Sequence, residues 1–351
     1  MLESRVRGRE PVPSRSDSPC IALIGCGAIA QSYYLPALAT YPAVMKELIL
    51  VDRDLHQAQA VGRQYGISKC VADHHAVLGL AQGAIVAVPT PSHHSVAVDL
   101  LSGGVQVLCE KPLAESASKA REMVAVANHH GVVLAANYTQ RLWPQFARVK
   151  EMLSAGMLGV PLAIEYTVGE IFEWPSLSGF YFNAGRSSAG VLRDRGAHVI
   201  DHICWWLGGK PELISCQNDS YGGPEAVTEV LFKHGQCEGR VHLSWLSRFP
   251  CRFAVRGQAG SVEGEVYDFR NLLVSTPDGN KRWMALRPRA TSKLDIAVML
   301  IANLIQVITA GEKPLIAGSD VLDSLEFVDE CYAAATRFPM PWYETTGVLH
   351  G

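Results

Sequence analysis

Over the first third of the chain, short runs of β-branched and other apolar residues alternate with longer stretches in which apolar positions recur every three or four residues. The short runs predict strands and the longer stretches predict helices. Strands that alternate with helices in this way form a parallel sheet with right-handed crossovers. The predicted strands are Ile21–Ile24, Glu47–Val51, Lys69–Ala72, Ala84–Val88, Val105–Cys109 and Val132–Ala136, and the predicted helices are Leu55–Tyr65, Ser95–Leu101 and Ser116–His130.

The pattern changes after Asn137. A helix is predicted over Trp143–Gly156, a half-buried strand over Leu162–Val168 and a second helix over Gly190–Leu207. From residue 211 to 286, strand-like runs follow one another too closely for crossover helices, so their sheet should be largely antiparallel. These runs are Glu229–Lys233, Gly239–Ser244, Arg252–Val255 and Leu272–Ser275, and the chain returns to helix at Ser292–Ala310 and Val321–Thr336.

A chain of 351 residues exceeds the size at which one core stops growing, which favours two domains. The expected fold class is α/β. A doubly wound (Rossmann) parallel sheet should occupy residues 20–136, and an α+β domain with a large, mostly antiparallel open sheet should occupy residues 137–338. The helices within 291–336 can pack back on the first domain. Residues 1–19 and 339–351 are expected to be terminal tails.

Composition excludes several classes of protein. The net charge of −3 provides no basic field for nucleic acid. No apolar run approaches the roughly 20 residues that span a bilayer, so we expect no membrane partner. The nine cysteines are odd in number and form no Cys-x-x-Cys pair. They indicate reduced thiols in a cytoplasmic compartment rather than a disulfide framework or a zinc site, and we expect no metal.

The first strand runs into Gly25-Cys-Gly-Ala-Ile-Ala30, a Gly-x-Gly-x-x-Ala turn. In this setting Gly25 permits a tight bend, Gly27 lets the backbone approach a pyrophosphate, and Ala30 keeps the following helix close to the sheet. The phosphates would meet the start of that helix, at Ala28 and Ile29. Because the motif stands between a strand and a helix, it predicts a dinucleotide site.

The second predicted strand ends at Asp52, at about the spacing where a carboxylate binds the adenosine ribose hydroxyls. This residue favours NAD, because a 2′-phosphate would meet a like charge. Arg53 follows directly and can partly accommodate that phosphate, so NADP remains possible.

Two further segments follow strands at the same expected edge of the sheet. Pro89 and His93 lie after the fourth strand, where the loop should flank the cofactor, although an imidazole at the start of a helix more often serves structure than catalysis. Glu110 and Lys111 follow the fifth strand, and an ammonium group there can polarise a substrate oxygen and orient the nicotinamide. Pro112 constrains the bend and is a candidate for a cis peptide bond.

Asp194 and His198 are four residues apart, so they share one face of the predicted helix. A carboxylate beside an imidazole would orient it and raise its basicity, which suits removal of an alcohol proton. Gly196 allows close approach, and Asp201, on the same segment, is interpreted as a residue that packs the helix or supports the catalytic residues from behind.

Together these motifs resemble the glucose–fructose oxidoreductase / inositol dehydrogenase / MocA family over about residues 20–338. The matching strings are Gly25-Cys-Gly-Ala-Ile-Ala30, Pro89-x-x-x-His93, Glu110-Lys-Pro-Leu-Ala114, Asn137-Tyr-x-Gln-Arg141, Gly156-Met-Leu-Gly159 and Asp194-x-Gly-x-His198-x-x-Asp201. The resemblance implies an open second sheet that often supports homodimers or homotetramers, and activity on sugars and cyclitols. It also implies a catalytic set of Lys111, Asp194 and His198.

The matched motifs bring polar and aromatic residues toward one cleft, where they would bind a polyhydroxyl substrate with the catalytic set. These residues are Tyr138, Arg141, Trp174, Tyr181 and Arg186. The chain departs from the family pattern in two places. Ser188-Ala189-Gly190 stands where the family commonly has three glycines, and Arg193 and Arg195 flank the signature aspartate. The arginines can bind an anionic group on the substrate or can pair with acidic residues elsewhere.

Three functions remain open from the sequence. The leading hypothesis is a dehydrogenase that moves a hydride between a secondary alcohol of a sugar, cyclitol or sugar derivative and a nicotinamide. A glycosidase or lyase that uses tightly bound NAD in a transient oxidation is the second hypothesis. A non-catalytic nucleotide-binding sensor is the third, and the retention of all three candidate catalytic groups counts against it.

Overall fold

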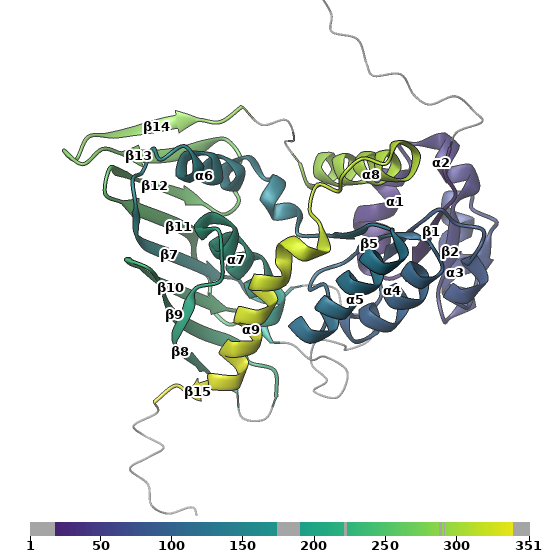
Figure 1. The fold of residues 1–351 in the computed structure, drawn as a ribbon, viewed down its shortest axis with the longest axis horizontal. Helices are drawn as coiled ribbons and strands as arrows, with labels where there is room; N and C mark the ends of the chain where they lie inside the picture. Colours follow the sequence, from purple (N-terminus) through teal and green to yellow (C-terminus); the bar gives the residue numbers. More distant parts are fainter. Residues whose placement is uncertain (1–17, 174–189, 221–222, 288–289, 291, 340–351) are drawn as a thin grey trace, which may run out of the picture.

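The computed structural model describes residues 18–173, 190–220, 223–287, 290 and 292–339, which form two domains side by side (Figure 1). The chain passes from the first domain to the second after residue 137. It returns to the first domain through α8 (Lys293–Ala310), which lies beside α1 (Leu35–Leu38).

The first domain is a six-stranded, wholly parallel sheet in the order β3-β2-β1-β4-β5-β6. This is the doubly wound order, in which the direction of winding reverses between β1 and β4. The strands are β1 (Ile21–Ile24), β2 (Ile49–Val51), β3 (Cys70–Val71), β4 (Gly83–Val86), β5 (Gln106–Cys109) and β6 (Leu134–Ala136). The helices are η1 (Ala30–Tyr34), α1, α2 (Pro42–Glu47), α3 (Leu55–Tyr65), η2 (His74–Val77), η3 (Thr90–Ser92), α4 (His93–Ser102) and α5 (Ala117–His130).

The second domain is built on a nine-stranded sheet in the order β14-β13-β12-β11-β7-β10-β9-β8-β15. Its pairs are antiparallel except β7 with β10 and β8 with β15, which confirms the largely antiparallel prediction. The strands are β7 (Pro161–Gly169), β8 (Glu212–Asn218), β9 (Val227–His234), β10 (Cys237–Ser244), β11 (Phe249–Gly257), β12 (Gly260–Glu265), β13 (Asn271–Ser275), β14 (Lys281–Ala285) and β15 (Thr336–Arg337). The helices are η4 (Thr139–Leu142), α6 (Pro144–Ser154), α7 (Val191–Leu207), η6 (Gly318–Val321) and α9 (Leu322–Ala334).

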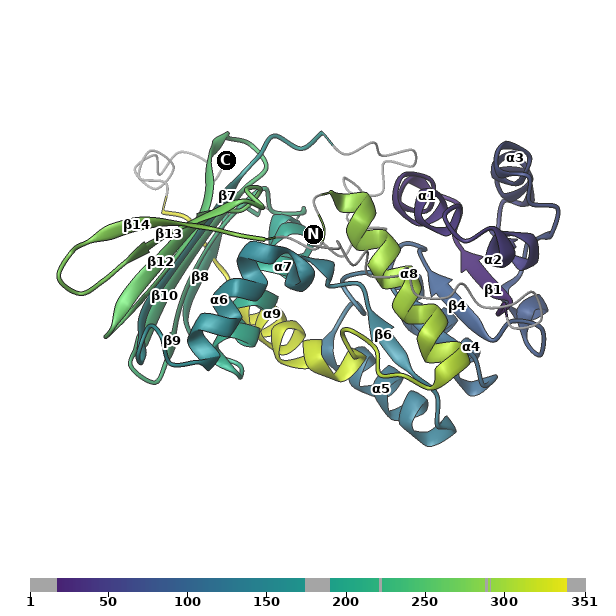
Figure 2. The ribbon, with the colours of Figure 1, turned by 90° about the horizontal axis from the view of Figure 1, so that it is seen from above.

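Helices α6, α7 and α9 lie on one face of the nine-stranded sheet, between the sheet and the first domain (Figure 2). The opposite face has no helical cover among the described residues. It carries a hollow of about 310 Å³ lined by charged side chains such as Glu165 and Arg256, and by Trp283. The homodimer or homotetramer that the resemblance implies through this open sheet stays a prediction.

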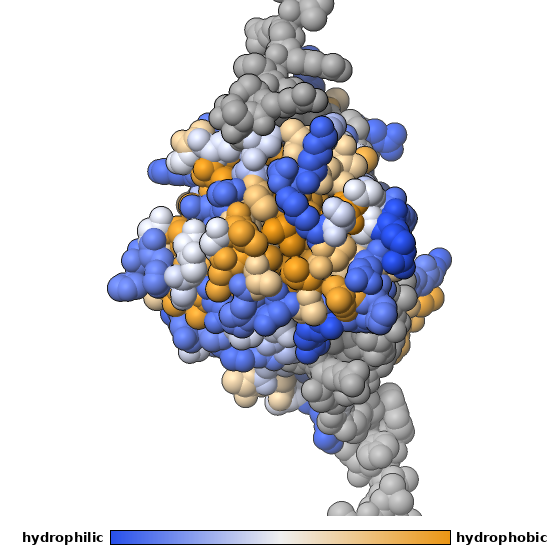
Figure 3. Space-filling view, turned by 90° about the vertical axis from the view of Figure 1, so that its right-hand side faces the viewer, coloured by the Kyte–Doolittle hydropathy of each residue, from blue (hydrophilic) through white to orange (hydrophobic). Residues whose placement is uncertain are grey.

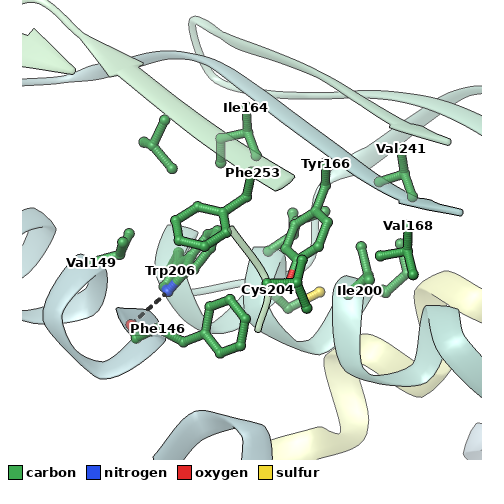
Figure 4. Packing of buried hydrophobic residues seen from close by; sticks show 14 of the residues in the cluster. Phe146, Val149, Ile164, Tyr166, Val168, Ile200, Cys204, Trp206, Val241 and Phe253 are labelled. Carbon is green, nitrogen blue, oxygen red and sulfur yellow. Dashed lines mark hydrogen bonds between the residues drawn. The ribbon is translucent and has the colours of Figure 1, made fainter. Parts of the chain in front are cut away.

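Aromatic side chains fill the space between α6, α7 and the sheet (Figure 4). Phe146 and Trp206 face Tyr166 and Phe253 from the strands, and the indole of Trp206 donates to the carbonyl oxygen of Phe146 over 3.2 Å. Such pairs contribute roughly 0.5–1.5 kcal/mol each beyond the apolar area that they bury. This packing fixes α7, the helix that carries Asp194 and His198.

Among the described residues, α8 alone is long and apolar enough to cross a membrane by composition. Apolar side chains of α8 are packed inside the protein. The core of the first domain includes Ala297, Leu300, Ile301, Leu304 and Ile305. Helix α8 therefore packs on the first domain. A space-filling view of the first-domain end of the molecule shows apolar side chains near its centre, surrounded by hydrophilic ones (Figure 3).

Several local predictions were inexact: strands β8, β12 and β14 were not predicted, and two helix ends differ for identifiable reasons. The sequence reading placed a strand from Glu47, but Glu47 ends α2, and β2 covers only Ile49–Val51. Pro42 begins α2 at a position where proline is favoured, and this signal was missed. Helix α9 ends at Ala334, two residues earlier than predicted, because residues 336 and 337 pair with β8 instead.

Candidate active site

The chemistry-bearing residues of the first domain gather at one edge of its sheet. Each follows a parallel strand, and the carboxyl ends of parallel strands meet at the same edge, where doubly wound sheets bind ligands. Gly25 follows β1, Asp52 follows β2, Pro89 follows β4 and Glu110 follows β5. The sequence motifs therefore form one site.

The two glycines of the turn after β1 are explained by different requirements. Gly25 has a φ of 96°, and a Cβ on it would lie 2.5 Å from the carbonyl oxygen of Ala87, so only glycine fits. A Cβ on Gly27 would meet nothing within 4 Å. The chain itself gives no steric reason for glycine at position 27, but close approach of a pyrophosphate does. Ala28 and Ile29 begin the helical turn that continues into η1.

Asp52 is bound to the same turn. One carboxylate oxygen accepts the N–H of Cys26 over 2.9 Å, and the other accepts the N–H of Asp54 over 3.0 Å. These bonds hold the carboxylate beside the turn, where the sequence places the adenosine ribose. Arg53 is exposed. The Asp52 carboxylate favours NAD, whereas Arg53 could contact a 2′-phosphate, so this pair is compatible with both NAD and NADP.

His93 joins two loops of the site. It is almost fully buried, and its two ring nitrogens lie 2.9 Å from the carbonyl oxygens of Val88 and Pro112. The Lys111–Pro112 peptide bond is cis, as the sequence suggested. Because both nitrogens are engaged by backbone, His93 can shape the loop around the cofactor but has no nitrogen left for chemistry. Pro89, in the same loop, is exposed.

Glu110 is a buried anchor at the end of β5. Its carboxylate accepts hydrogen bonds from the Tyr34 hydroxyl over 2.7 Å, the Asn137 amide and the N–H of Lys111 over 3.0 Å. Burial raises the pKa of Glu110, and these donors and the Lys111 ammonium oppose that rise. Sequence reasoning missed Tyr34. It is 76 residues away, so no local signal could have found it.

Lys111 reaches across the domain boundary to α7. Its Nζ donates to Asp194 Oδ1 over 2.6 Å and to the Asp194 carbonyl oxygen over 3.0 Å. Burial favours the neutral acid, but the Lys111 ammonium and the Arg195 guanidinium hold the pKa of Asp194 below its ordinary value. Asp194 is therefore ionised at neutral pH and holds the Lys111 ammonium beside the carboxyl edge of the sheet.

His198 lies one turn further along α7. Its Nδ1 has no hydrogen-bond partner among the described residues, and its ring meets Tyr138 edge-on at 6.0 Å between centroids. Burial and then the positive charge of Lys111 hold the pKa of His198 well below 6.5, so the imidazole is neutral at pH 7. The expected bond from Asp194 to His198 is absent, because the carboxylate is directed at Lys111 instead.

The structure does not bring every predicted substrate residue into this group. Arg141 is buried, and its guanidinium makes a bidentate ion pair with Asp201, both bonds being 2.7 Å long. Arg141 is therefore an internal structural residue, which corrects its place in the substrate set. The prediction that Asp201 is a packing residue agrees with its complete burial. Tyr138 is only 1% exposed, and its ring contacts the ring of His198 edge-on. The remaining three, Trp174, Tyr181 and Arg186, lie outside the described residues.

The two arginines beside Asp194 both have acidic neighbours. Arg193 lies 3.1 Å from Asp329 and over the ring of Tyr332. Arg195 lies 2.8 Å from Glu170 at the end of β7. Of the two possibilities that the sequence left open, pairing within the chain is the one that the structure shows.

The residues fit a dinucleotide. Open space over Gly27 could receive the phosphates, the Asp52 carboxylate lies beside the same turn, and Lys111 lies at the carboxyl edge that the nicotinamide would reach. A doubly wound domain with this turn, joined to a second domain that supplies a carboxylate and an imidazole, defines a two-domain nucleotide-dependent oxidoreductase.

Comparison with known proteins places the chain within this class. Residues 20–138 match the model of the oxidoreductase family with an NAD-binding Rossmann fold, and residues 146–263 match the GFO/IDH/MocA C-terminal domain. The chain belongs to the GFO/IDH/MocA oxidoreductase family, and it is an enzyme that uses a nicotinamide dinucleotide.

Named relatives share much of its length. The D-apiose dehydrogenase of Paraburkholderia graminis is 27% identical over 90% of this chain and 87% of its own. The D-glucoside 3-dehydrogenase of Escherichia coli is 30% identical over 54% of each chain. Among solved structures, a levoglucosan dehydrogenase in complex with NADH and levoglucosan has a TM-score of 0.77 at 16% identity, covering 90% of this chain and 96% of its own.

Proposed function

We propose that this enzyme oxidises a secondary alcohol of a neutral sugar, cyclitol or sugar derivative with NAD as hydride acceptor. The observation that carries the proposal is the Lys111–Asp194 ion pair, 2.6 Å long, with the neutral His198 one turn away. An ammonium, a carboxylate and a neutral imidazole at one edge can bind a hydroxyl oxygen and remove its proton. The names of the relatives, which are sugar dehydrogenases, support the same substrate class.

His198 is proposed to accept the alcohol proton. A general base must be unprotonated at the working pH, and burial beside Lys111 keeps the imidazole in that form. Its Nδ1 has no hydrogen-bond partner among the described residues, so no acidic group in that part of the chain holds the proton in place of the substrate.

Lys111 is proposed to donate a hydrogen bond to the reacting oxygen and to stabilise the negative charge that develops as the proton leaves. Asp194 holds the ammonium in place through one carboxylate oxygen and its own backbone carbonyl. When bound, the dinucleotide supplies the nicotinamide carbon that accepts the hydride. Glu110, through the N–H of Lys111, fixes the backbone from which the ammonium extends.

NAD is proposed over NADP because the Asp52 carboxylate faces the ribose position and would repel a 2′-phosphate. Replacing Asp52 with Ala should weaken NAD binding and narrow its advantage over NADP, since a charge-assisted hydrogen bond and a like-charge repulsion are both lost. Titration of both cofactors against wild type and variant measures this. Tighter binding of NADP than of NAD by the wild-type enzyme would contradict the proposal.

A neutral substrate is proposed because both arginines that flank Asp194 already have acidic neighbours. Their charges are compensated, so an anionic substrate would gain little. Neutral sugars should therefore match or exceed their phosphates and uronic acids in kcat/KM, at both low and raised salt. A large advantage of the anionic analogues that disappears at raised salt would instead reveal a cationic subsite.

The decisive experiment is a screen of sugars and cyclitols with NAD⁺ that follows nicotinamide absorbance and substrate consumption together. A net dehydrogenase accumulates NADH in step with oxidised product. A glycosidase or lyase that oxidises its substrate transiently would consume sugar without net NADH, and a sensor would bind NAD without consuming any sugar. Either of these two outcomes would replace the proposed function.

A further inference from the structure

A cluster of two histidines and two aspartates lies outside the set of residues assigned to the active site. Asp73, His74 and His75 are consecutive, and they stand at the start of η2, directly after the edge strand β3. Asp99 faces them from α4. None of these residues takes part in the proposed reaction.

Local structure explains why the two imidazoles lie together. The Asp73 carboxylate caps η2 by accepting the N–H of His75 over 3.0 Å, which fixes the start of the helix. The rings of His74 and His75 then lie 4.2 Å apart between centroids, tilted by 34°. Two neighbouring rings thus present nitrogens in similar directions.

Carboxylates face both ends of this pair of rings. On one side, Asp73 Oδ1 lies 2.8 Å from His75 Nδ1 and 3.6 Å from His74 Nδ1. On the other side, Asp99 Oδ2 lies 2.9 Å from His74 Nε2 and 3.4 Å from His75 Nε2.

We propose that Asp73, His74 and His75 bind a divalent transition-metal ion such as Zn²⁺. Their ligand atoms lie within 4.8 Å of one another, the one such group among the residues that the structure describes. Ligands at 2.0–2.1 Å in a tetrahedral shell lie about 3.3 Å apart. The observed separations of Asp73 Oδ1 from the two Nδ1 atoms, 2.8 and 3.6 Å, bracket this spacing.

Asp99 would orient the ligands. A metal-bound histidine usually donates its other ring N–H to a carboxylate, which fixes the tautomer and raises the basicity of the ligand. If the ion binds the two Nδ1 atoms, both Nε2 atoms face Asp99 Oδ2, as that general pattern requires. Water would complete the shell, because the Asp73 and His75 side chains are more than half exposed.

The chemical class of the ion follows from the donor set. Imidazole nitrogen suits Zn²⁺ and related transition ions, whereas Mg²⁺ and Ca²⁺ prefer oxygen ligands throughout. Two carboxylates balance the charge of one divalent ion. The expectation of no metal rested on the absence of paired cysteines, which does not bear on adjacent histidines.

The test is equilibrium dialysis of the full chain against ZnCl₂ near pH 7.5, with the bound metal counted by mass spectrometry. Wild type should retain one zinc ion more than His75→Ala and more than the double variant His74→Ala/His75→Ala. The His75 side chain is 55% exposed, so its removal leaves the core intact. Asp99→Asn should bind zinc about 10–100-fold more weakly. Thermal unfolding should show zinc raising the Tm of wild type more than that of the variants.

The matched control is His129→Ala/His130→Ala, which removes the other exposed pair of adjacent histidines, 4.9 Å apart at the end of α5 and outside any three-ligand group of the described chain. This variant should bind zinc like wild type. X-ray absorption of the zinc-loaded protein should show nitrogen and oxygen at about 2.0–2.1 Å and no sulfur at about 2.3 Å. Equal zinc binding by wild type and the His75→Ala variant, or a sulfur shell from the free cysteines, would overturn the proposal.

Discussion

His198 differs from an ordinary surface histidine in that its neutral form is enforced by its surroundings. Replacing it with Ala should lower kcat by about 10²-fold or more, the usual scale for a positioned proton-transfer group. NAD affinity should change little, because the residue comes from α7 of the second domain. Steady-state kinetics with a separate NAD titration would measure both quantities, and near-normal turnover would show that another group is the base.

The pH profile tests the same residue in another way. A base works only when unprotonated, so the rate falls as the pH drops through its pKa. Because burial and Lys111 hold the pKa of His198 well below 6.5, kcat/KM at saturating NAD should stay level as the pH falls to 6.5 and decline only below it. An acid limb centred at or above pH 6.5 would mean that His198 is not the group being titrated.

The two glycines of the nucleotide turn offer a matched pair of variants. Gly25→Ala should destabilise the fold, because the positive φ disfavours a side chain and the Cβ would meet Ala87 at 2.5 Å. Gly27→Ala should leave the free energy of unfolding within about 1 kcal/mol of wild type but weaken NAD binding, since its Cβ occupies space open only to a ligand. Denaturant unfolding and cofactor titration separate the two effects. If NAD binding were unchanged in Gly27→Ala, the phosphates would have to bind at another place.

At the scale of elements, the start of α7 depends on a residue from a distant loop. Gly190, before the first residue of α7, brings no side-chain cap of its own. Instead the buried Glu225 carboxylate accepts the N–H of Leu192 over 3.0 Å and the Tyr332 hydroxyl over 2.7 Å. A Cβ on Gly190 would lie 2.2 Å from this carboxylate, which explains glycine at that position.

Glu225→Ala should therefore lower the free energy of unfolding by about 1–3 kcal/mol, because a buried N–H and hydroxyl lose their acceptor. It should also lower kcat more than it raises KM, since Asp194 is in the first turn of the same helix. Glu225→Gln retains an acceptor oxygen and should recover most of both losses. Glu312→Ala, at an exposed glutamate, is the control. Equal losses in the Ala and Gln variants would show that the charge, not the cap, is what matters.

Local features of the structure could be predicted from the sequence, whereas contacts between distant segments could not. The parallel sheet, the glycine turn and the positions of Lys111 and Asp194 follow from local patterns, and the structure agrees with them. The partners of the polar side chains do not, because they come from segments far along the chain. The i,i+4 spacing correctly placed Asp194 and His198 on one face, but an ammonium 83 residues away takes the carboxylate. The motif that includes Arg141 likewise gave no sign of its burial against Asp201.

At the scale of the whole molecule, a buried ion pair joins three segments of the second domain that are far apart in the sequence. Arg141, just beyond the first domain in η4, binds Asp201 of α7 through two bonds, and its Nη2 also donates to the Asp320 carbonyl oxygen of η6 over 2.8 Å. Three segments that approach one another only in the folded chain therefore meet at one guanidinium. Asp201 itself is 0% exposed.

Asp201→Asn should lower the free energy of unfolding by about 3–5 kcal/mol, because it leaves the Arg141 charge buried without a compensating carboxylate. Glu151→Gln breaks the exposed Arg148–Glu151 pair of α6 and should cost less than about 1 kcal/mol. Denaturant unfolding of both variants gives the comparison. The double variant Arg141→Met/Asp201→Leu removes both charges and should recover much of the loss, since apolar side chains of similar volume can replace a buried pair. If Asp201→Asn were as mild as Glu151→Gln, water or another anion would have to reach Arg141, and the pair would not be the buried contact that the structure shows.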